Sequence, residues 1–194
     1  MSKRIALLSA VAFSALAITA SVIAPAGAQE KKMMKSELSG EKTVMVGGAA
    51  MFPSKNIIQN AVNSKDHTTL VAAVKAAGLV ETLEGKGPFT VFAPTNAAFG
   101  KLPAGTVDTL VKPENKATLT KILTYHVVPG RLEASDLTDG KKLKTVQGEE
   151  LTVKRSGDTV MIIDSKGGSS TVTIPNVNQS NGVIHVVDTV LMPS

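Results

Sequence analysis

The chain contains no cysteine and no tryptophan, and its aromatic residues are one tyrosine and five phenylalanines among 194 residues. The absence of cysteine excludes disulfide bonds, a thiol nucleophile and the lipidated cysteine of a bacterial lipoprotein. Stability must therefore come from packing, which suits an exported bacterial protein better than a small disulfide-rich animal module. So few aromatic side chains, without clustered positive charge, also argue against a nucleic-acid partner bound by base stacking.

Motifs for catalysis and for metal or nucleotide binding are also absent. The sequence has no GxSxG elbow, no P-loop and no GxGxxG fingerprint. The three histidines, His67, His126 and His185, are far apart and form no HxxxH or HExxH pair. The acidic pair Glu149-Glu150 is expected in a turn, where hydrated carboxylates keep an ordinary pKa and are poor acid–base catalysts. We therefore predict a protein that is not an enzyme and that uses no metal or cofactor.

The N-terminus has the three parts of a secretory signal. Lys3 and Arg4 precede an apolar stretch from Ile5 to Ile23, and Ala26-Gly27-Ala28 matches an A-x-A cleavage site. We predict a signal peptide over residues 1–28 and a secreted or periplasmic mature protein without integral membrane association. An uncleaved membrane anchor is the alternative, because the apolar stretch could just span a bilayer, but interspersed serine and threonine weaken it.

The rest of the chain is predicted to be a flexible leader over residues 29–50, which mixes charged residues with methionine and glycine, and one domain over 51–194. Helical spacing of apolar residues is found near 57–61 and at 70–77, 97–99, 106–111 and 119–124. Short β runs separated by turn residues are found at 89–93, 143–146, 151–155, 159–163, 171–174 and 183–191. Helices thus precede most strands, which favours an α+β fold over an alternating α/β fold.

Three segments of the domain form a recognisable combination: GPFTVFAPTNAAF at residues 87–99, YHVVPG at 125–130 and NGVIHVVD at 181–188. Together they resemble a fasciclin (FAS1) domain of the small secreted bacterial type. The first and third resemble the two hallmark boxes of the family, and the second resembles its Tyr-His motif. The resemblance runs from about Pro53 to Pro193, and it implies a β-wedge with a layer of short helices.

The same resemblance implies adhesion, or binding to a cell-surface or matrix protein or glycan. It makes Tyr125 and His126 candidate interaction residues, although a histidine after an apolar helical stripe more often donates its ring N–H to a backbone carbonyl. Asn176 and Val177 stand where animal members carry an adhesive Asp-Ile pair, so the carboxylate of that binding mode is missing. The alternative function is a small-ligand carrier with a groove between wedge and helices, near Tyr125 and His126.

Overall fold

The computed structural model describes residues 42–194, so the predicted signal peptide and the first part of the predicted leader lie outside the described residues. The helices are α2 (Ile57–Ala61), η2 (Lys65–His67), α3 (Thr68–Ala77), α4 (Val80–Glu84), α5 (Asn96–Gly100), α6 (Thr106–Leu110), η3 (Pro113–Asn115) and α7 (Lys116–Tyr125). The strands are β1 (Val44–Val46), β2 (Ala49–Met51), β3 (Phe89–Pro94), β4 (Val127–Pro129), β5 (Lys142–Lys144), β6 (Glu150–Ser156), β7 (Thr159–Ile163), β8 (Ser169–Gln179) and β9 (Gly182–Val187). This order of elements confirms the predicted α+β class.

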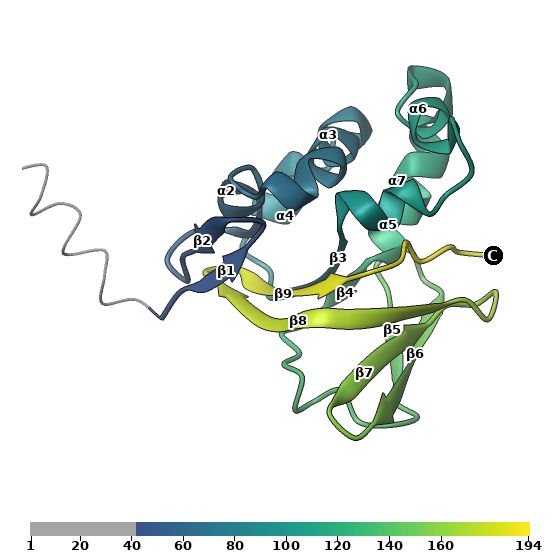
Figure 1. Cartoon of the computed structure of the whole chain (residues 1–194). Coiled ribbons are helices and arrows are strands. Elements are labelled where there is room, and N and C mark those ends of the chain that lie inside the picture. Colours follow the sequence, from purple (N-terminus) through teal and green to yellow (C-terminus); the bar gives the residue numbers. More distant parts are fainter. Residues whose placement is uncertain (1–41) are drawn as a thin grey trace, which may run out of the picture. The chain divides into compact units, whose positions relative to one another are not determined.

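Strands β3 to β9 form one mixed sheet in the order β4-β3-β9-β8-β7-β6-β5. Strands β3 and β9 run parallel, and every other neighbouring pair runs antiparallel. The sheet curls so far that its two end strands approach each other. The N–H of Val146, just after β5, donates to the Val127 carbonyl of β4 at 2.8 Å. The helices lie on one side of this nearly closed sheet, which is the arrangement that the fasciclin resemblance implied (Figure 1).

The three segments that resemble fasciclin motifs contain three adjacent strands of this sheet, β4, β3 and β9. Phe89 at the start of β3 lies opposite Pro129 on one side and Gly182 on the other. Glycine is needed at position 182, because a Cβ there would collide with the Phe89 carbonyl oxygen. Motifs that are far apart in the sequence therefore build one structural unit.

Two hydrophobic cores meet at β3 and β9, because successive side chains of a strand point to opposite faces. Val91 and Ile184 join apolar residues of α2, α3, α4 and α7 in a core beneath the helices. Phe92 joins side chains of β6 and β7 in a second core, inside the curled sheet. Its ring stacks on the His185 ring, with centroids 5.7 Å apart. The helical layer and the curled sheet are thus both anchored on β3 and β9.

Strands β1 and β2 form an antiparallel hairpin, which corrects the predicted leader. Gly47 and Gly48 supply its turn with φ angles of +57° and +75°, which glycine adopts without steric penalty. Val46 and Met51 are buried in the core beneath the helices. The predicted flexible segment 29–50 is therefore wrong at its C-terminal end. Each strand has only three residues, which is too short for an alternating pattern to be recognised.

Candidate functional site

The Tyr-His pair lies where α7 ends and β4 begins. The Tyr125 side chain is fully buried inside the curled sheet, and its hydroxyl accepts a hydrogen bond from the Ser165 N–H at 2.9 Å. His126 is also buried, with Nδ1 2.8 Å from the Ile122 carbonyl and Nε2 3.0 Å from the Leu191 nitrogen. Because the Leu191 N–H donates to Nε2, the proton of the ring is on Nδ1, which donates to Ile122. The predicted bond from the ring N–H to a backbone carbonyl is therefore present.

The surroundings of His126 keep its ring neutral. Burial lowers the pKa of His126 from 6.5 to about 4, and the Ile122 carbonyl and the Asp164 charge oppose that shift only in part. The ring joins the end of α7 to the C-terminal segment that contains Leu191. Neither Tyr125 nor His126 reaches the surface. Their burial supports the structural role that the sequence suggested as the alternative to direct binding of a partner.

Asn176 and Val177 lie in β8 where its register against β9 shifts. Asn176 has a φ of +56°, in the left-handed region that asparagine tolerates better than most residues. Its Oδ1 accepts a hydrogen bond from the Ala134 N–H at 2.7 Å, and its own N–H donates to His185 Nδ1 at 3.4 Å. Val177 is buried in the core beneath the helices. Asn176 thus holds the loop after β4 against β8, and Val177 fills the core.

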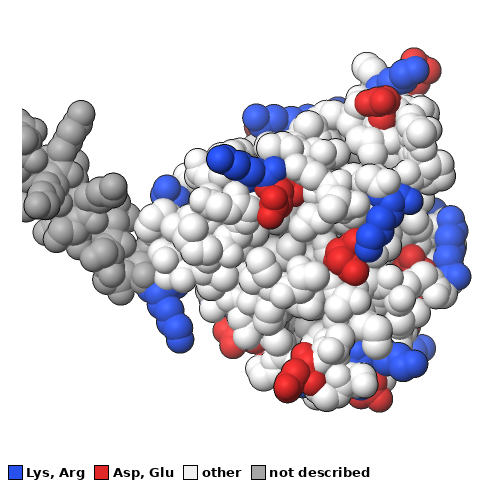
Figure 2. Space-filling view, in the orientation of Figure 1, with Lys and Arg blue, Asp and Glu red and all other residues white. Residues whose placement is uncertain are grey.

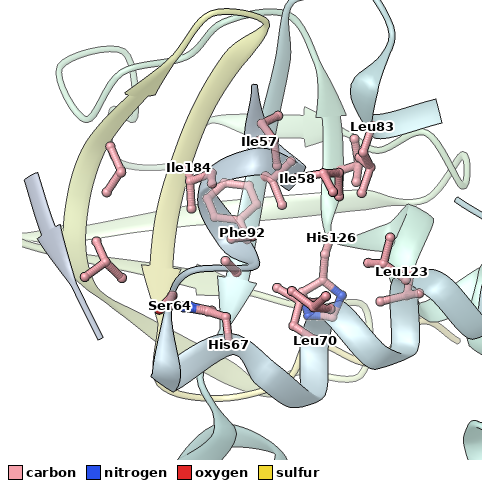
Figure 3. A pocket seen from close by; sticks show the side chains of 18 of the residues that line it. Ile57, Ile58, Ser64, His67, Leu70, Leu83, Phe92, Leu123, His126 and Ile184 are labelled. Atoms are coloured by element: carbon pink, nitrogen blue, oxygen red, sulfur yellow. Dashed lines mark hydrogen bonds between the residues drawn. The ribbon is translucent and has the colours of Figure 1, made fainter. Parts of the chain in front are cut away.

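A cavity of about 40 Å³ lies between the β1–β2 hairpin, the helices α2, α3 and α4, and the strands β3 and β9. In the view of Figure 3, Ile57 and Leu83 lie above the ring of Phe92, and two histidines lie below it. The polar side chains of the wall are those of Ser64, His67 and His126. Among residues 42–194, no aspartate, glutamate, lysine or arginine lines it. The cavity is therefore apolar, with a few uncharged polar groups.

The structure brings two of the four predicted interaction residues to this cavity. His126 and Val177 line it, whereas Tyr125 and Asn176 do not. Tyr125 lies in the other core, inside the curled sheet. The four residues therefore form no single site, because His126 lines the cavity whereas Tyr125, the residue before it, does not.

His67 is the residue of the cavity that sequence reasoning missed. Its side chain is 4% exposed, its Nδ1 lies 2.9 Å from the Ser64 Oγ, and its Nε2 has no hydrogen-bond partner. Burial lowers the pKa of His67, and the Ala93 carbonyl and the Asp66 charge oppose the shift. The sequence did contain a signal for the burial of His67. This residue lies three positions before Leu70, so it extends the apolar stripe of α3 by one turn.

The Glu149-Glu150 pair differs from two ordinary hydrated carboxylates. The Ser194 N–H donates to Glu149 Oε2 at 2.9 Å, and the Ser165 hydroxyl donates to the same oxygen at 2.8 Å. These bonds stabilise the carboxylate and lower the pKa of Glu149 to about 2. The predicted ordinary pKa is therefore wrong for Glu149. The shift is away from neutral pH, so Glu149 is no better suited to proton transfer.

Two other kinds of site are absent from residues 42–194. This range holds no group of three or more histidine, aspartate or glutamate side chains placed to bind a metal ion. No helix in the same range has the length and apolar character needed to cross a membrane. Helices α3 and α7, the longest among these residues, have 10 residues each, whereas a membrane-spanning helix needs about 20.

The model of the fasciclin domain family matches residues 65–193. The chain belongs to this family, which is known for adhesion or binding roles. A solved structure of a FAS1 domain pair, from the insect cell adhesion molecule Fasciclin I, has a TM-score of 0.65 and 19% sequence identity, and the match covers 73% of this chain and 52% of that one. At this identity the likeness concerns the fold alone. The sequence-based assignment to the family is confirmed.

Bacterial relatives share more of the sequence. Protein sll1483 of Synechocystis is 49% identical over 153 residues, which are 79% of this chain and 82% of the relative. The immunogenic protein MPB70 of Mycobacterium bovis is 40% identical over 138 residues, or 69% of this chain and 66% of the relative. The cell surface glycolipoprotein MPB83 of the same species is 40% identical over 153 residues, or 76% of this chain and 64% of that protein. The chain thus spans just under two thirds of the mycobacterial relatives.

Proposed function

We propose that this chain is an exported FAS1 module, secreted or periplasmic, that mediates adhesion or binds a cell-surface or matrix protein or glycan. The observation that carries the proposal is the fasciclin family match over residues 65–193. The fold shared with domains of an insect cell adhesion molecule supports it, as does a relative named for the cell surface. A role without catalysis is part of the proposal, because the sequence shows no nucleophile, base and orienting group in a known arrangement.

The four candidate interaction residues are buried or half-buried, so their proposed part is to position an exposed surface: Tyr125, His126, Asn176 and Val177. Asn176 binds the Ala134 N–H, and the side chain of Asn178 accepts a hydrogen bond from Arg131 at 2.6 Å. Both bonds fix the loop between β4 and β5 against β8. We assign residues 130–141 as the surface that meets the partner, because half of the residues of this loop are exposed and two bonds tie it to β8.

Charge does not single out a partner of one sign. Figure 2 shows acidic and basic side chains interspersed over the face that it draws. The loop at 130–141 also carries both signs, with Arg131 and Lys141 beside Glu133, Asp136 and Asp139. Such a surface favours recognition by shape and hydrogen bonds over long-range attraction.

Beads that carry the full chain test the proposal. They should retain cells or cell-surface extract of the source organism, and soluble chain should compete for that retention. Ser135→Arg in the loop should abolish retention by blocking the surface. Ser169→Arg should not, because it changes an exposed serine at the other end of β8. Retention no better than that of heat-unfolded chain would contradict an adhesive function, and equal retention by both variants would exclude the loop.

A second function, small-ligand carriage, is favoured by the cavity that His126 lines. Its position between the helices and the sheet is the position expected for the groove, although Tyr125 does not reach it. Native mass spectrometry of protein purified from its own source should show a bound small molecule. A mass equal to that of the protein alone would contradict carriage without bearing on adhesion.

A further inference from the structure

His67 Nε2 has an unusual position among the buried polar atoms. In the described part of the chain it is the only buried side-chain nitrogen or oxygen without a well-formed hydrogen bond, although the Ala93 carbonyl lies close enough to the imidazole to raise its pKa. Native structures pair nearly all such atoms, because an unpaired one loses its bonds to water and gains none in return. The atom belongs to a side chain that lines the apolar cavity. The combination indicates a missing hydrogen-bonding group at this place.

The other polar side chains of the cavity wall are already paired. Both ring nitrogens of His126 are paired with backbone groups, one with a carbonyl and one with an N–H. The Ser64 hydroxyl lies 2.9 Å from the other nitrogen of His67. His67 Nε2 is therefore the one buried polar side-chain atom of the described wall that lacks a well-formed hydrogen bond. A ligand that matches this wall needs one polar group and an otherwise apolar body.

We propose that the cavity binds a neutral lipophilic molecule with a single hydroxyl group, whose oxygen pairs with His67 Nε2. The molecule is neutral because no charged side chain of the described residues lines the wall to balance a charge. A hydroxyl suits either tautomer of His67. If Ser64 donates to Nδ1, then Nε2 carries the proton and donates to the hydroxyl oxygen; if Nδ1 donates to Ser64, the hydroxyl donates to Nε2. This inference rests on the second proposed function and names its ligand class.

The β1–β2 hairpin is the part of the wall that must move to admit such a molecule. At about 40 Å³ the closed cavity has room for only a few water-sized groups. The hairpin forms a sheet of its own, apart from the curled sheet, and its Val46 and Met51 side chains line the cavity. One backbone bond, from the Lys65 N–H to the Gly47 carbonyl at 3.2 Å, ties its turn to the start of η2. Outward movement of the hairpin enlarges the cavity without opening the sheet.

Three eight-carbon probes test the ligand class on the full-length chain: 1-octanol, octane and octanoate at pH 7. We expect saturable binding of 1-octanol with one site per chain, at least tenfold tighter than octane or octanoate. In ¹⁵N-labelled protein, 1-octanol should shift the Nε2 resonance of His67 and leave both ring nitrogens of His126 unchanged. Equal affinity for 1-octanol and octane, or an unchanged Nε2 resonance at saturation, would overturn the proposal, since a bound water would then satisfy His67.

Two variants separate the polar contact from the apolar cavity. His67→Phe should lose the preference for 1-octanol over octane, and retention of that preference would overturn the assignment to Nε2. Met51→Ala should tighten binding of 1-decanol severalfold by enlarging the closed cavity. Met45→Ala is its matched control, because Met45 lies on the same hairpin but is 60% exposed. If a variant fails to fold, the ¹⁵N measurement on the unaltered protein decides. Co-purification of a charged molecule that displaces 1-octanol would leave carriage standing and overturn the hydroxyl assignment.

Discussion

His126 shows how a residue that resembles a binding motif acts within the fold. The imidazole donates to the Ile122 carbonyl, which lies in the last turn of α7, and accepts the N–H of Leu191 in the C-terminal segment, so it satisfies one backbone group of each. These bonds require the neutral ring with its proton on Nδ1. His67 and His185 are also buried, and burial lowers the pKa of each. All three histidines therefore oppose protonation in the folded state.

Stability should fall between pH 7 and pH 5. The pKa of His126 is about 4 in the fold and about 6.5 in the unfolded chain, so the unfolded state binds more protons in this range. The stability that the neutral ring contributes is complete above pH 6.5 and is lost as the pH falls toward 4. His126 alone should account for roughly 2 kcal/mol of the loss between pH 7 and pH 5. Urea unfolding at a series of pH values measures it.

A direct titration checks the cause of this loss. In a proton NMR titration His126 should stay neutral down to about pH 4, and a midpoint near 6.5 would contradict the argument. The urea unfolding series stays above pH 5 so that the loss of stability reports on histidine and not on Glu149. Glu149 has a lowered pKa of about 2, and its contribution is lost only as the pH falls below 4.5, through its own folded pKa.

Asn176 should tolerate aspartate better than alanine. Its φ of +56° strains an alanine, and alanine also removes the acceptor for the Ala134 N–H. We expect Asn176→Ala to lower the free energy of unfolding by about 2 kcal/mol. Asn176→Asp keeps both the backbone preference and the acceptor, so it should change stability by less than about 0.5 kcal/mol. Urea unfolding of both variants measures the difference, and two equal values would contradict the role assigned to this side chain.

At the scale of elements, the contact between β3 and β9 joins the first and third fasciclin segments. Gly182→Ala should destabilise the protein by about 3 kcal/mol or more, because its Cβ would meet the Phe89 carbonyl and force the two strands apart. Gly100→Ala is the control. Gly100 ends α5 with open space around the place of a Cβ, so alanine should leave stability unchanged or raise it by up to about 1 kcal/mol. Thermal unfolding of both variants decides, and equal transition temperatures would contradict the close approach.

The sequence predicted the elements whose pattern is long enough to show a period. The stripe at Leu70, Ala73, Val74 and Ala77 predicted α3, and the structure has Gly78 at its end with a φ of +73°. Strand β8 was predicted only at 171–174, because the following irregularity at Asn176 breaks the alternation, although the strand continues to Gln179. Strand β9 was predicted to extend to Leu191 but ends at Val187.

The cavity was less predictable than the fold. It is formed by side chains from the hairpin, the helices and two central strands. A local sequence pattern does not predict where side chains from such distant segments pack without filling the space between them. The stripe on α3 could be followed back to His67, but the sequence does not show that Nε2 lacks a partner. That fact comes from the packing of the whole domain. The sequence therefore revealed the family motifs but not the buried nitrogen that lacks a partner in the described part of the chain.

At the scale of the whole molecule, export makes a specific chemical prediction. Protein isolated from its source should begin at Gln29, because cleavage is expected after the Ala26-Gly27-Ala28 site. Intact-mass measurement and N-terminal sequencing should find this species in the periplasmic or extracellular fraction. Intact residues 1–28 in a membrane fraction would contradict cleavage and support the alternative of an anchor.

The meeting of β4 and β5 has a consequence for a domain that is displayed at high density. Open sheets present strands with free N–H and carbonyl groups, and two copies that touch can extend each other's sheet into an aggregate. Here the two end strands of the large sheet approach each other, linked from Val146 to Val127. The hairpin sheet has edges of only three residues. Copies crowded on one surface can therefore touch without polymerising through the large sheet.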